Sequence, residues 1–248
     1  KFKEQLRVCV ENEVDYIITS LGSPKPVIDA CKPKGIKVFC DVVDIKYAKK
    51  VEELGADAVI AVNSDAGGHS GPSKAKNLIP ELVSECNIPV ISAGGIGDGK
   101  GIQEMLDLGA CGLSMGTTFI ACEEADISQD YKQAIVDHGE KDIVLTTKLS
   151  GTPCTVINTP FVQKIGTKES WLEWILNKNK KLKKYAKMAI AYKGMKMLEK
   201  SAFKASYKNM WCAGPSCEYV DDIKPVSGIV ESLVGGLKES NQPEMEIS

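Results

Sequence analysis

Short, continuously apolar runs recur along the first half of the chain, and each ends in glycine, serine or aspartate before a helix-like segment. The runs occupy residues 14–20, 36–42, 57–62, 89–93 and 112–120. Helix-period segments of about ten residues, with charged faces, separate them. Buried parallel strands in βα units have this composition. The pattern predicts an α/β fold built from βα units.

Residues that begin and end helices support this interpretation. Asp44 precedes a helical pattern at 45–54 as an N-cap candidate, and Gly55 follows it in the position that favours a left-handed backbone. Gly109 has the same place after the segment 101–108. Two further helices are expected at 26–31 and 78–86.

The overall layout remains open at this level. An open doubly wound sheet and a closed (βα)8 TIM barrel both consist of such units, and both carry functional residues at the carboxyl ends of strands. The periodicity therefore does not choose between them.

The second half of the chain has a different pattern. We expect a helix at 123–138, an extended segment at 143–151, irregular backbone at 153–166, a long Lys-rich helix at 171–200, a helix at 222–237 and a frayed tail after it. The predicted domain organisation is a set of barrel units at 1–122, a mostly helical substrate or lid domain at 123–217, a terminal helix at 218–240 and a tail at 241–248.

Charge and hydropathy exclude two classes of partner. The 248 residues include 31 Lys and Arg against 33 Asp and Glu, so the net charge is −2 and no broad cationic surface for nucleic acid is expected. No apolar run approaches the roughly 20 residues that span a bilayer. We therefore expect no nucleic-acid partner and no membrane span.

The nine cysteines are an odd number without a C-x-x-C pair, and several lie in strand-like runs. This favours reduced thiols packed as small hydrophobic side chains, and hence a cytoplasmic protein. Only His69 and His138 could supply imidazole, so we expect no metal site.

The strongest local signal is the glycine-rich stretch 89–101. A strand delivers Ala93, Gly94 and Gly95 to its carboxyl end before a helix, and small residues there let backbone N–H groups approach an anion. Gly101 stands where a nucleotide P-loop needs Ser or Thr, and the Rossmann glycine spacing also fails. A phosphate cradle is favoured over a flexible turn without a ligand.

A second element of this kind follows at Met115, Gly116 and Thr117, at the end of the next strand. There Gly116 offers a backbone N–H without a side chain beside it, and Thr117 offers a hydroxyl. In barrels the loops after the last two strands jointly bind phosphate. The two elements together predict one phosphate site.

The third element is Gly68-His69, set among glycines after the strand 57–62. Such a histidine can act as a base near neutral pH or can anchor a substrate. We expect this role for His69 and a structural role for His138.

These motifs resemble those of the nitronate monooxygenase family, formerly called 2-nitropropane dioxygenases, which also includes flavin-dependent enoyl-(acyl carrier protein) reductases. The similarity covers nearly the whole chain. It lies in residues 55–60, 66–69, 89–95, 115–119, 145–151 and 211–214.

The resemblance implies an FMN-dependent TIM barrel with a small helical domain over the flavin. It places His69 at the isoalloxazine as catalytic base or substrate anchor. It implies further that the cofactor is held by Gly68, Ala93, Gly94, Gly95, Met115, Gly116 and Thr117, and the substrate by Ser150 and Gly214.

The activity implied is oxidation of alkyl nitronates or nitroalkanes with O₂, by a possible homodimer. The alternatives are an NAD(P)H-dependent enoyl reductase-like flavoenzyme and a non-redox barrel that binds a phosphate ligand. Three departures from relatives could shift the substrate or electron donor: Asp41 where several have Lys, Pro215 where many have Gln, and no Arg within 152–155.

The count of strands suggests an incomplete barrel. If the run 14–20 is a barrel strand and 112–120 is the eighth, about five of eight strands are present, and five cannot close a barrel. The resemblance implies that the remaining strands precede these, so we expect the sequence to be the C-terminal part of a longer chain.

Overall fold

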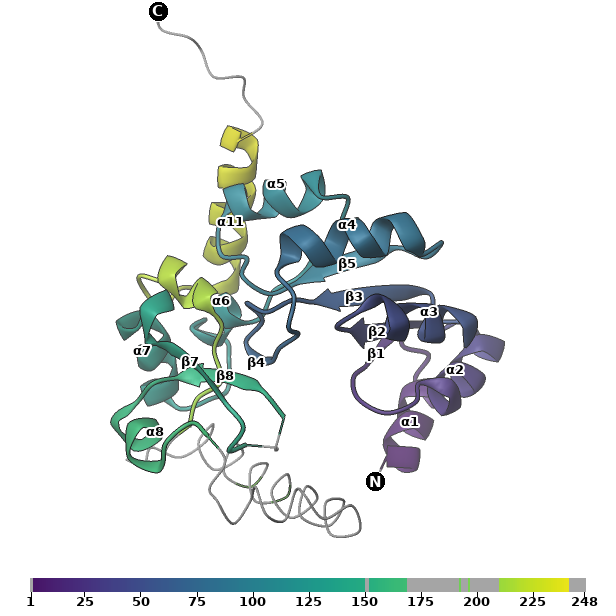
Figure 1. The fold of residues 1–248 in the computed structure, drawn as a ribbon, viewed down its shortest axis with the longest axis horizontal. Coiled ribbons are helices and arrows are strands. Elements are labelled where there is room, and N and C mark those ends of the chain that lie inside the picture. The colour runs from purple at the N-terminus through teal and green to yellow at the C-terminus, as the bar shows by residue number, and fades with distance from the viewer. Residues whose placement is uncertain (1, 150–151, 169–191, 193–195, 197–209, 241–248) are drawn as a thin grey trace, which may run out of the picture. The chain divides into compact units, whose positions relative to one another are not determined.

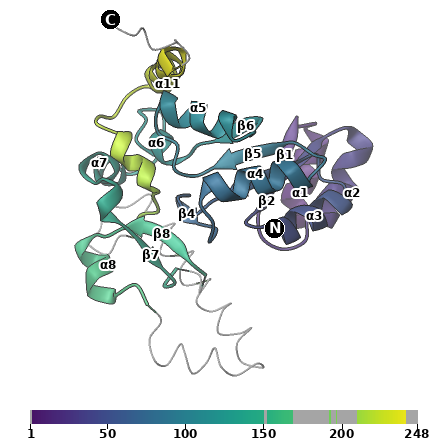
Figure 2. The same cartoon turned by 45° about the horizontal axis from the view of Figure 1, so that its top comes forward.

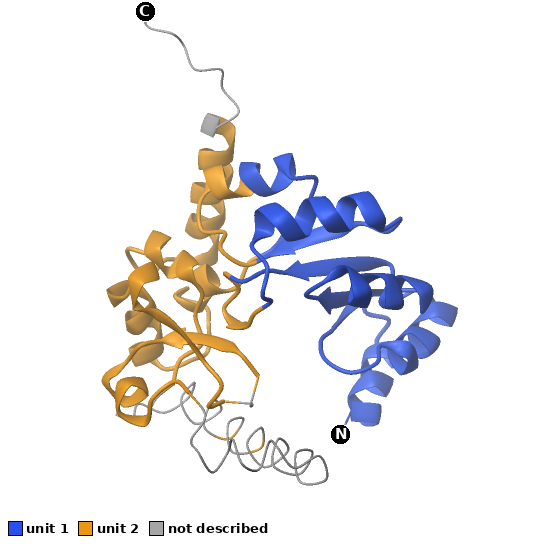
Figure 3. Cartoon of the chain, viewed as in Figure 1, with its two compact units in different colours: residues 1–64, 71–93, 103–114 blue, residues 65–70, 94–102, 115–248 orange. Residues whose placement is uncertain are grey.

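The computed structural model describes residues 2–149, 152–168, 192, 196 and 210–240. Contacts divide the chain into two compact units, shown in blue and orange in Figure 3. The first comprises residues 1–64, 71–93 and 103–114, and the second 65–70, 94–102 and 115–248. The domain boundaries expected at 122, 217 and 240 stay a prediction.

A five-stranded parallel sheet forms the first unit (Figure 1). Its strands are β1 (Tyr16–Thr19), β2 (Lys37–Val42), β3 (Ala58–Val62), β5 (Val90–Ala93) and β6 (Gly112–Ser114). They pair in the order β1-β2-β3-β5-β6, so each strand lies beside the next parallel strand along the chain. In a doubly wound sheet the order of the strands reverses at a switch point, whereas in a barrel each strand is added beside the preceding one. The order confirms the predicted α/β fold of the barrel type.

Helices cover the sheet of the first unit (Figures 1 and 2). They are α1 (Phe2–Glu11), α2 (Lys25–Cys31), the short 3-10 helix η1 (Lys32–Lys34), α3 (Ile45–Glu53) and α4 (Ala75–Glu85). The core between these layers contains Ile28 of α2, Leu78 and Leu82 of α4, and Val38 and Val59 of the sheet, all nearly or fully buried. Helix α5 (Gly99–Asp107) begins in the second unit and ends in the first.

Three residues expected to begin or end helices in this unit are confirmed, although α4 begins at Ala75 and not at the expected position 78. The Asp44 carboxylate accepts a hydrogen bond of 2.8 Å from the Tyr47 N–H and caps α3. Gly55 and Gly109 have φ angles of +96° and +97°, which place both in the left-handed region. Aspartate and glycine were informative here because each has a backbone role that few other residues perform.

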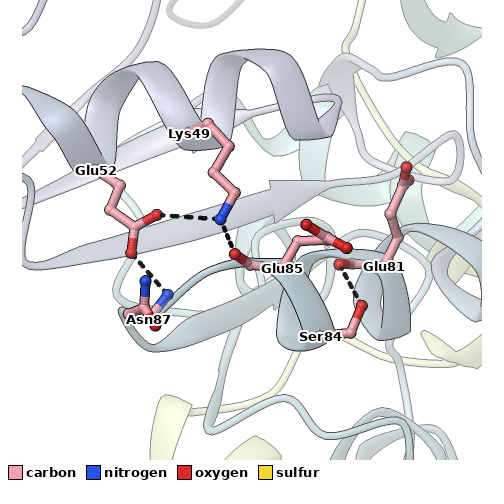
Figure 4. A network of polar contacts seen from close by, with 6 residues as sticks. All are labelled: Lys49, Glu52, Glu81, Ser84, Glu85 and Asn87. Atoms are coloured by element: carbon pink, nitrogen blue, oxygen red, sulfur yellow. Dashed lines mark hydrogen bonds and ion pairs between the residues drawn. The ribbon is translucent and has the colours of Figure 1, made fainter.

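A polar network joins α3 to the end of α4 (Figure 4). Lys49 pairs with Glu52 at 3.8 Å and also donates to the backbone carbonyl of Glu85. The backbone N–H of Asn87 donates to the Glu52 carboxylate at 2.7 Å. The network therefore satisfies backbone groups just where α4 turns into β5.

The half-buried carboxyl of Asp41 is expected to make the stability of the protein depend on pH. Burial raises the pKa of the Asp41 carboxyl above its ordinary value of 3.8, and a hydrogen bond with Ser20 offsets part of that rise. A carboxyl with a raised pKa in the folded state favours folding at low pH, and this contribution is lost as the pH rises through the folded pKa. We expect Asp41→Asn to be more stable than the parent at pH 7. Urea titrations should show the gap between the two proteins shrinking toward pH 4; a gap independent of pH would contradict this.

The second unit contains a three-stranded antiparallel sheet in the order β4-β8-β7. Its strands are β4 (Gly68–His69), β7 (Ile143–Thr146) and β8 (Cys154–Ile157). Its helices are α6 (Thr117–Ile120), α7 (Gln129–Asp137), α8 (Pro160–Ile165) and α11 (Val226–Ser240), with 3-10 helices η2 (Glu140–Asp142) and η3 (Pro215–Tyr219). Ile135, Ile157 and Ala213 are fully buried in one of its apolar clusters. None of the described helices is long and apolar enough to span a membrane.

The limits of three expected elements are corrected as follows. The strand expected at 112–120 ends at Ser114, and α6 begins after Gly116, because the glycine interrupts an otherwise apolar run. The helix expected at 123–138 begins only at Gln129. The helix expected at 222–237 begins at Val226, just after Pro225 rather than around it.

The segment 153–166 was expected to be irregular, and this is wrong. It contains β8 and α8, and Thr159 caps α8 by accepting a hydrogen bond of 3.3 Å from the Val162 N–H. The signal was present in the sequence, because Thr159 followed by Pro160 is a common start of a helix. The helix expected at 171–200 and the tail after 240 lie outside the described residues, apart from two isolated positions.

Candidate functional site

Backbone segments that are far apart in sequence meet in the second unit. A Cβ atom added to Gly67 would lie 2.9 Å from the Gly214 nitrogen and 3.0 Å from Thr117 Oγ1. One added to Gly214 would lie 2.7 Å from the Asp65 carbonyl oxygen, and one on Gly95 would lie 3.1 Å from the Asp65 side chain. Three of the predicted site residues, Gly95, Thr117 and Gly214, are thus neighbours of the loop that leads to His69.

Gly94 and Gly95 need the conformational freedom of glycine. Their φ angles are +110° and +79°, and Gly95 is exposed. Residues with side chains are strained in this region of backbone conformation. The two residues turn the chain sharply at the carboxyl end of β5, as the phosphate-cradle prediction requires.

The rest of the glycine-rich loop is held by close packing. A Cβ on Gly97 would overlap the ring of Tyr219, and one on Gly99 would overlap the backbone of Gly236 in α11. Glycines that permit such approaches fix the course of a loop, since neighbouring groups leave it no room to move. This packing argues against a flexible turn, and the binding of a ligand there stays a prediction.

Asp98 changes where an anion could bind. Its carboxylate accepts a hydrogen bond of 2.7 Å from the Gly101 N–H, so α5 begins at Gly99 and not at the expected Gly101. A carboxylate at this helix terminus satisfies one donor and repels a second anion. The start of α5 is therefore not expected to bind the phosphate, and the prediction rests on the turn at Gly94 and Gly95 and on the segment 115–117.

Gly116 offers an open position in that segment. It is exposed, its φ angle is −129°, and a Cβ atom built there would meet nothing within 4 Å. Met115 beside it is half-buried, whereas Thr117 is buried and accepts a hydrogen bond of 3.0 Å from the Gly214 N–H. The Thr117 hydroxyl hydrogen can therefore point to another acceptor.

We predict that Thr117→Val lowers stability, whereas Thr117→Ser does not. Valine has nearly the shape of threonine but leaves the buried Gly214 N–H without an acceptor, at a cost of about 1–3 kcal/mol. Serine keeps the hydroxyl and should stay much closer to the parent protein. Denaturant titrations of the three proteins measure this, and equal losses for Val and Ser would show that the hydroxyl is not responsible.

His69 lies on the two-residue strand β4, which pairs with β8 through Gly68 opposite Thr155 and His69 opposite Cys154. The Thr155 hydroxyl lies 2.6 Å from the Ala66 carbonyl oxygen and 3.2 Å from that of Gly68. Buried Thr155 thus positions the loop that presents the exposed imidazole. Sequence reasoning missed Thr155, because no local motif indicates that β8 runs beside β4.

The remaining predicted site residues are placed as follows. Ala93 ends β5 in the first unit, where its carbonyl oxygen accepts a hydrogen bond of 3.1 Å from the Asn63 N–H. Gly68 precedes His69 in β4, and Ser150 lies outside the described residues. Roles for these residues stay predictions.

His138 has the structural surroundings expected of it. It follows α7, and its Nδ1 lies 2.8 Å from the Ala134 carbonyl oxygen one turn earlier. Across the ranges that the structure describes, no cluster of three or more His, Cys, Asp or Glu side chains could hold a metal ion.

Proteins with similar sequences include a probable nitronate monooxygenase and a dehydrogenase. A probable nitronate monooxygenase of Staphylococcus saprophyticus is 35% identical over 177 residues, which are 66% of this chain and 50% of that protein. An octahydro-indene carboxyl-CoA dehydrogenase of Rhodococcus jostii is 35% identical over 161 residues, 65% of this chain and 46% of that protein. The chain spans about half the length of the curated relatives it matches.

Solved structures extend the similarity to most of the fold. FabK from Thermotoga maritima has 32% identity and a TM-score of 0.79, over 96% of this chain and 72% of that one. A nitroalkane oxidase from Streptomyces ansochromogenes shares the fold, with a TM-score of 0.75 at 22% identity over 96% and 68% of the two chains. A family model described as nitronate monooxygenase matches residues 1–236. The chain therefore belongs to the nitronate monooxygenase family.

Proposed function

We propose that this chain carries the cofactor site of an FMN-dependent oxidoreductase that oxidises alkyl nitronates or nitroalkanes with O₂. The observation that supports this most is the meeting of Gly95, Thr117 and Gly214 beside the loop that presents His69. Membership of the nitronate monooxygenase family supports the same class of reaction.

The residues present fit the phosphate of FMN. Gly94 and Gly95 turn with positive φ, and a Cβ atom built on Gly116 would meet nothing within 4 Å. Backbone N–H groups of these glycines and the Thr117 hydroxyl would hold the phosphate as donors. Gly68, Met115 and Ala93 are proposed as further cofactor contacts.

Bound FMN would supply the redox chemistry, taking an electron pair from the substrate and passing it to O₂. The part of the protein is to place and deprotonate the substrate. His69 is exposed at the end of a fixed loop, so its imidazole can take the proton from the carbon beside a nitro group.

Gly214 and Ser150 are the proposed substrate residues. The Gly214 N–H already donates to Thr117, so we propose that Gly214 shapes the substrate side through its backbone and holds the Thr117 hydroxyl in place. Pro215 follows it and begins η3, where it leaves no N–H to contact a substrate.

The test of this function compares His69→Ala with His69→Gln on two substrates. A neutral nitroalkane needs a base, whereas a preformed nitronate has already lost its proton. If His69 is the base, both variants should oxidise the nitroalkane about 100-fold more slowly and should keep most of their activity on the nitronate. If it is an anchor, glutamine should preserve activity on both substrates.

Oxygen consumption measures these rates, and FMN content serves as the control because no phosphate contact is changed. Full nitroalkane turnover by His69→Ala would remove the proposed role of His69. Absence of turnover by the parent protein on every nitroalkane and nitronate tested would overturn the proposed substrate class.

A second candidate is an NAD(P)H-dependent enoyl reductase-like flavoenzyme, which the 32% identity to FabK favours. Anaerobic addition of NAD(P)H separates the two. Rapid bleaching of the flavin absorbance would favour the reductase, whereas an unchanged spectrum favours the nitronate oxidation proposed above. A colourless protein that binds no added FMN would favour the non-redox phosphate-binding barrel.

A cytoplasmic location and a homodimer are further parts of this proposal. All nine cysteines are free thiols, which is the state expected in a reducing compartment. Light scattering of the purified protein would test the dimer.

A further inference from the structure

Two cysteines of the second unit lie close enough to react with each other. The Sγ atoms of Cys154 and Cys212 are 3.8 Å apart, although 58 positions separate them in sequence. Cys154 is 1% exposed, whereas Cys212 is half-buried. A disulfide requires about 2.05 Å between the sulfurs, so a small local movement would join them.

Backbone pairing brings these two thiols together. Cys154 begins β8, and a β-bridge between Val156 and Cys212 places the second thiol beside the same strand. The Ile157 N–H donates to the Trp211 carbonyl oxygen at 2.9 Å and extends this pairing. The approach of the two sulfurs therefore follows from the fold and not from the orientation of one side chain.

The two thiols differ in reactivity. A hydrogen bond from Cys154 lowers the pKa of the Cys212 thiol, although burial opposes this. The same hydrogen bond and burial raise the pKa of Cys154. Cys212 is also the more exposed of the two, so we expect it to react first with a dissolved oxidant and Cys154 to be its partner.

Each thiol is also joined to the proposed active site. Cys154 lies opposite His69 in the pairing of β4 with β8. Cys212 lies two residues before Gly214, whose N–H donates to Thr117. The carbonyl oxygen of Cys212 accepts a hydrogen bond of 2.5 Å from the Tyr131 hydroxyl. A bond between the sulfurs would pull on both segments.

We propose that Cys154 and Cys212 form a peroxide-sensitive thiol pair whose disulfide weakens cofactor binding at the adjacent site. The Cys212 thiolate attacks a peroxide oxygen, the O–O bond breaks, and the products are a Cys212 sulfenic acid and, after protonation, water. The Cys154 sulfur then attacks Cys212, the S–O bond breaks, and the oxygen leaves as a second water with the Cys154 proton. Two thiols lose two electrons, and hydrogen peroxide is reduced to two waters.

The test treats the full protein with hydrogen peroxide and maps its peptides by mass spectrometry before and after reduction. We expect a Cys154–Cys212 cross-link that dithiothreitol reverses. Cys111→Ser is the matched control, because Cys111 is exposed and is the thiol that unselective oxidation would reach first. This variant should form the cross-link as the parent does. Cross-links or oxidation at Cys111 with Cys154 and Cys212 still reduced would overturn the proposal.

Cys154→Ser should retain a trappable sulfenic acid on Cys212 and form no cross-link, whereas Cys212→Ser should give neither product. The effect on the cofactor rests on the proposed function and is measured separately, by titration with FMN. Oxidation should weaken binding about fivefold or more in the parent and not in Cys154→Ser. Unchanged affinity after complete cross-linking would overturn the coupling. A protein that binds no FMN in either state would overturn the proposed function and leave the cross-link result standing.

Discussion

Gly116→Leu is expected to weaken FMN binding about tenfold or more and to leave thermal stability almost unchanged. The backbone at Gly116 has a negative φ, and no atom beyond its chain neighbours lies within 4 Å of an added Cβ, so a side chain can begin there without strain. It would project into the open space that we assign to the phosphate. The expected result is thus a loss of binding without a loss of folding.

Gly228→Leu is the matched control for this experiment. Gly228 lies in α11, and an added Cβ there also meets nothing within 4 Å, but it belongs to none of the proposed cofactor segments. FMN titration and thermal unfolding of both variants give the comparison. Equal FMN affinities of Gly116→Leu and the parent would show that the phosphate lies elsewhere.

Gly99→Ala is expected to lower the free energy of unfolding by about 3 kcal/mol. Gly99 begins α5, and its added Cβ would overlap the Gly236 and Leu237 backbone of α11. Backbone atoms cannot rotate away as the end of a flexible side chain can, so the two helices would have to separate. Because the loop 94–98 leads into α5, FMN affinity should fall as well.

Gly235→Ala, one residue before the contact of Gly236 with Gly99, is expected to raise the free energy of unfolding. An added Cβ at Gly235 meets nothing within 4 Å, and alanine in a helix interior is favoured over glycine by about 1 kcal/mol. Denaturant titrations should therefore show one alanine destabilising the protein and the other stabilising it. A neutral Gly99→Ala would mean that α5 and α11 do not pack as closely as described.

The sequence predicted those parts of the fold that depend on local chemistry. Asp44, Gly55 and Gly109 were recognised because each performs a backbone task within its own segment, and β2, β3 and β5 were recognised from apolar runs. The order of the strands could not be obtained from periodicity, since a barrel and a doubly wound sheet use the same units. The order of paired strands in the structure distinguishes the two layouts.

The candidate site was predicted as separate glycine motifs, and its long-range contacts were not. Nothing local indicates that Thr155 holds the Ala66–Gly68 backbone, or that Thr117 accepts a hydrogen bond from Gly214, because these partners are about 90 residues or more apart. The capping of α5 by Asp98 could have been predicted, since aspartate is a preferred N-cap residue.

The most direct test of the central claim compares the binding of FMN with that of riboflavin, which has the same ring system but no phosphate. Fluorescence titration of the protein measures both affinities. If Gly94, Gly95, Gly116 and Thr117 hold the phosphate, FMN should bind about 100-fold more tightly than riboflavin, and Gly116→Leu should remove most of that difference. Equal affinity for the two flavins would contradict the account.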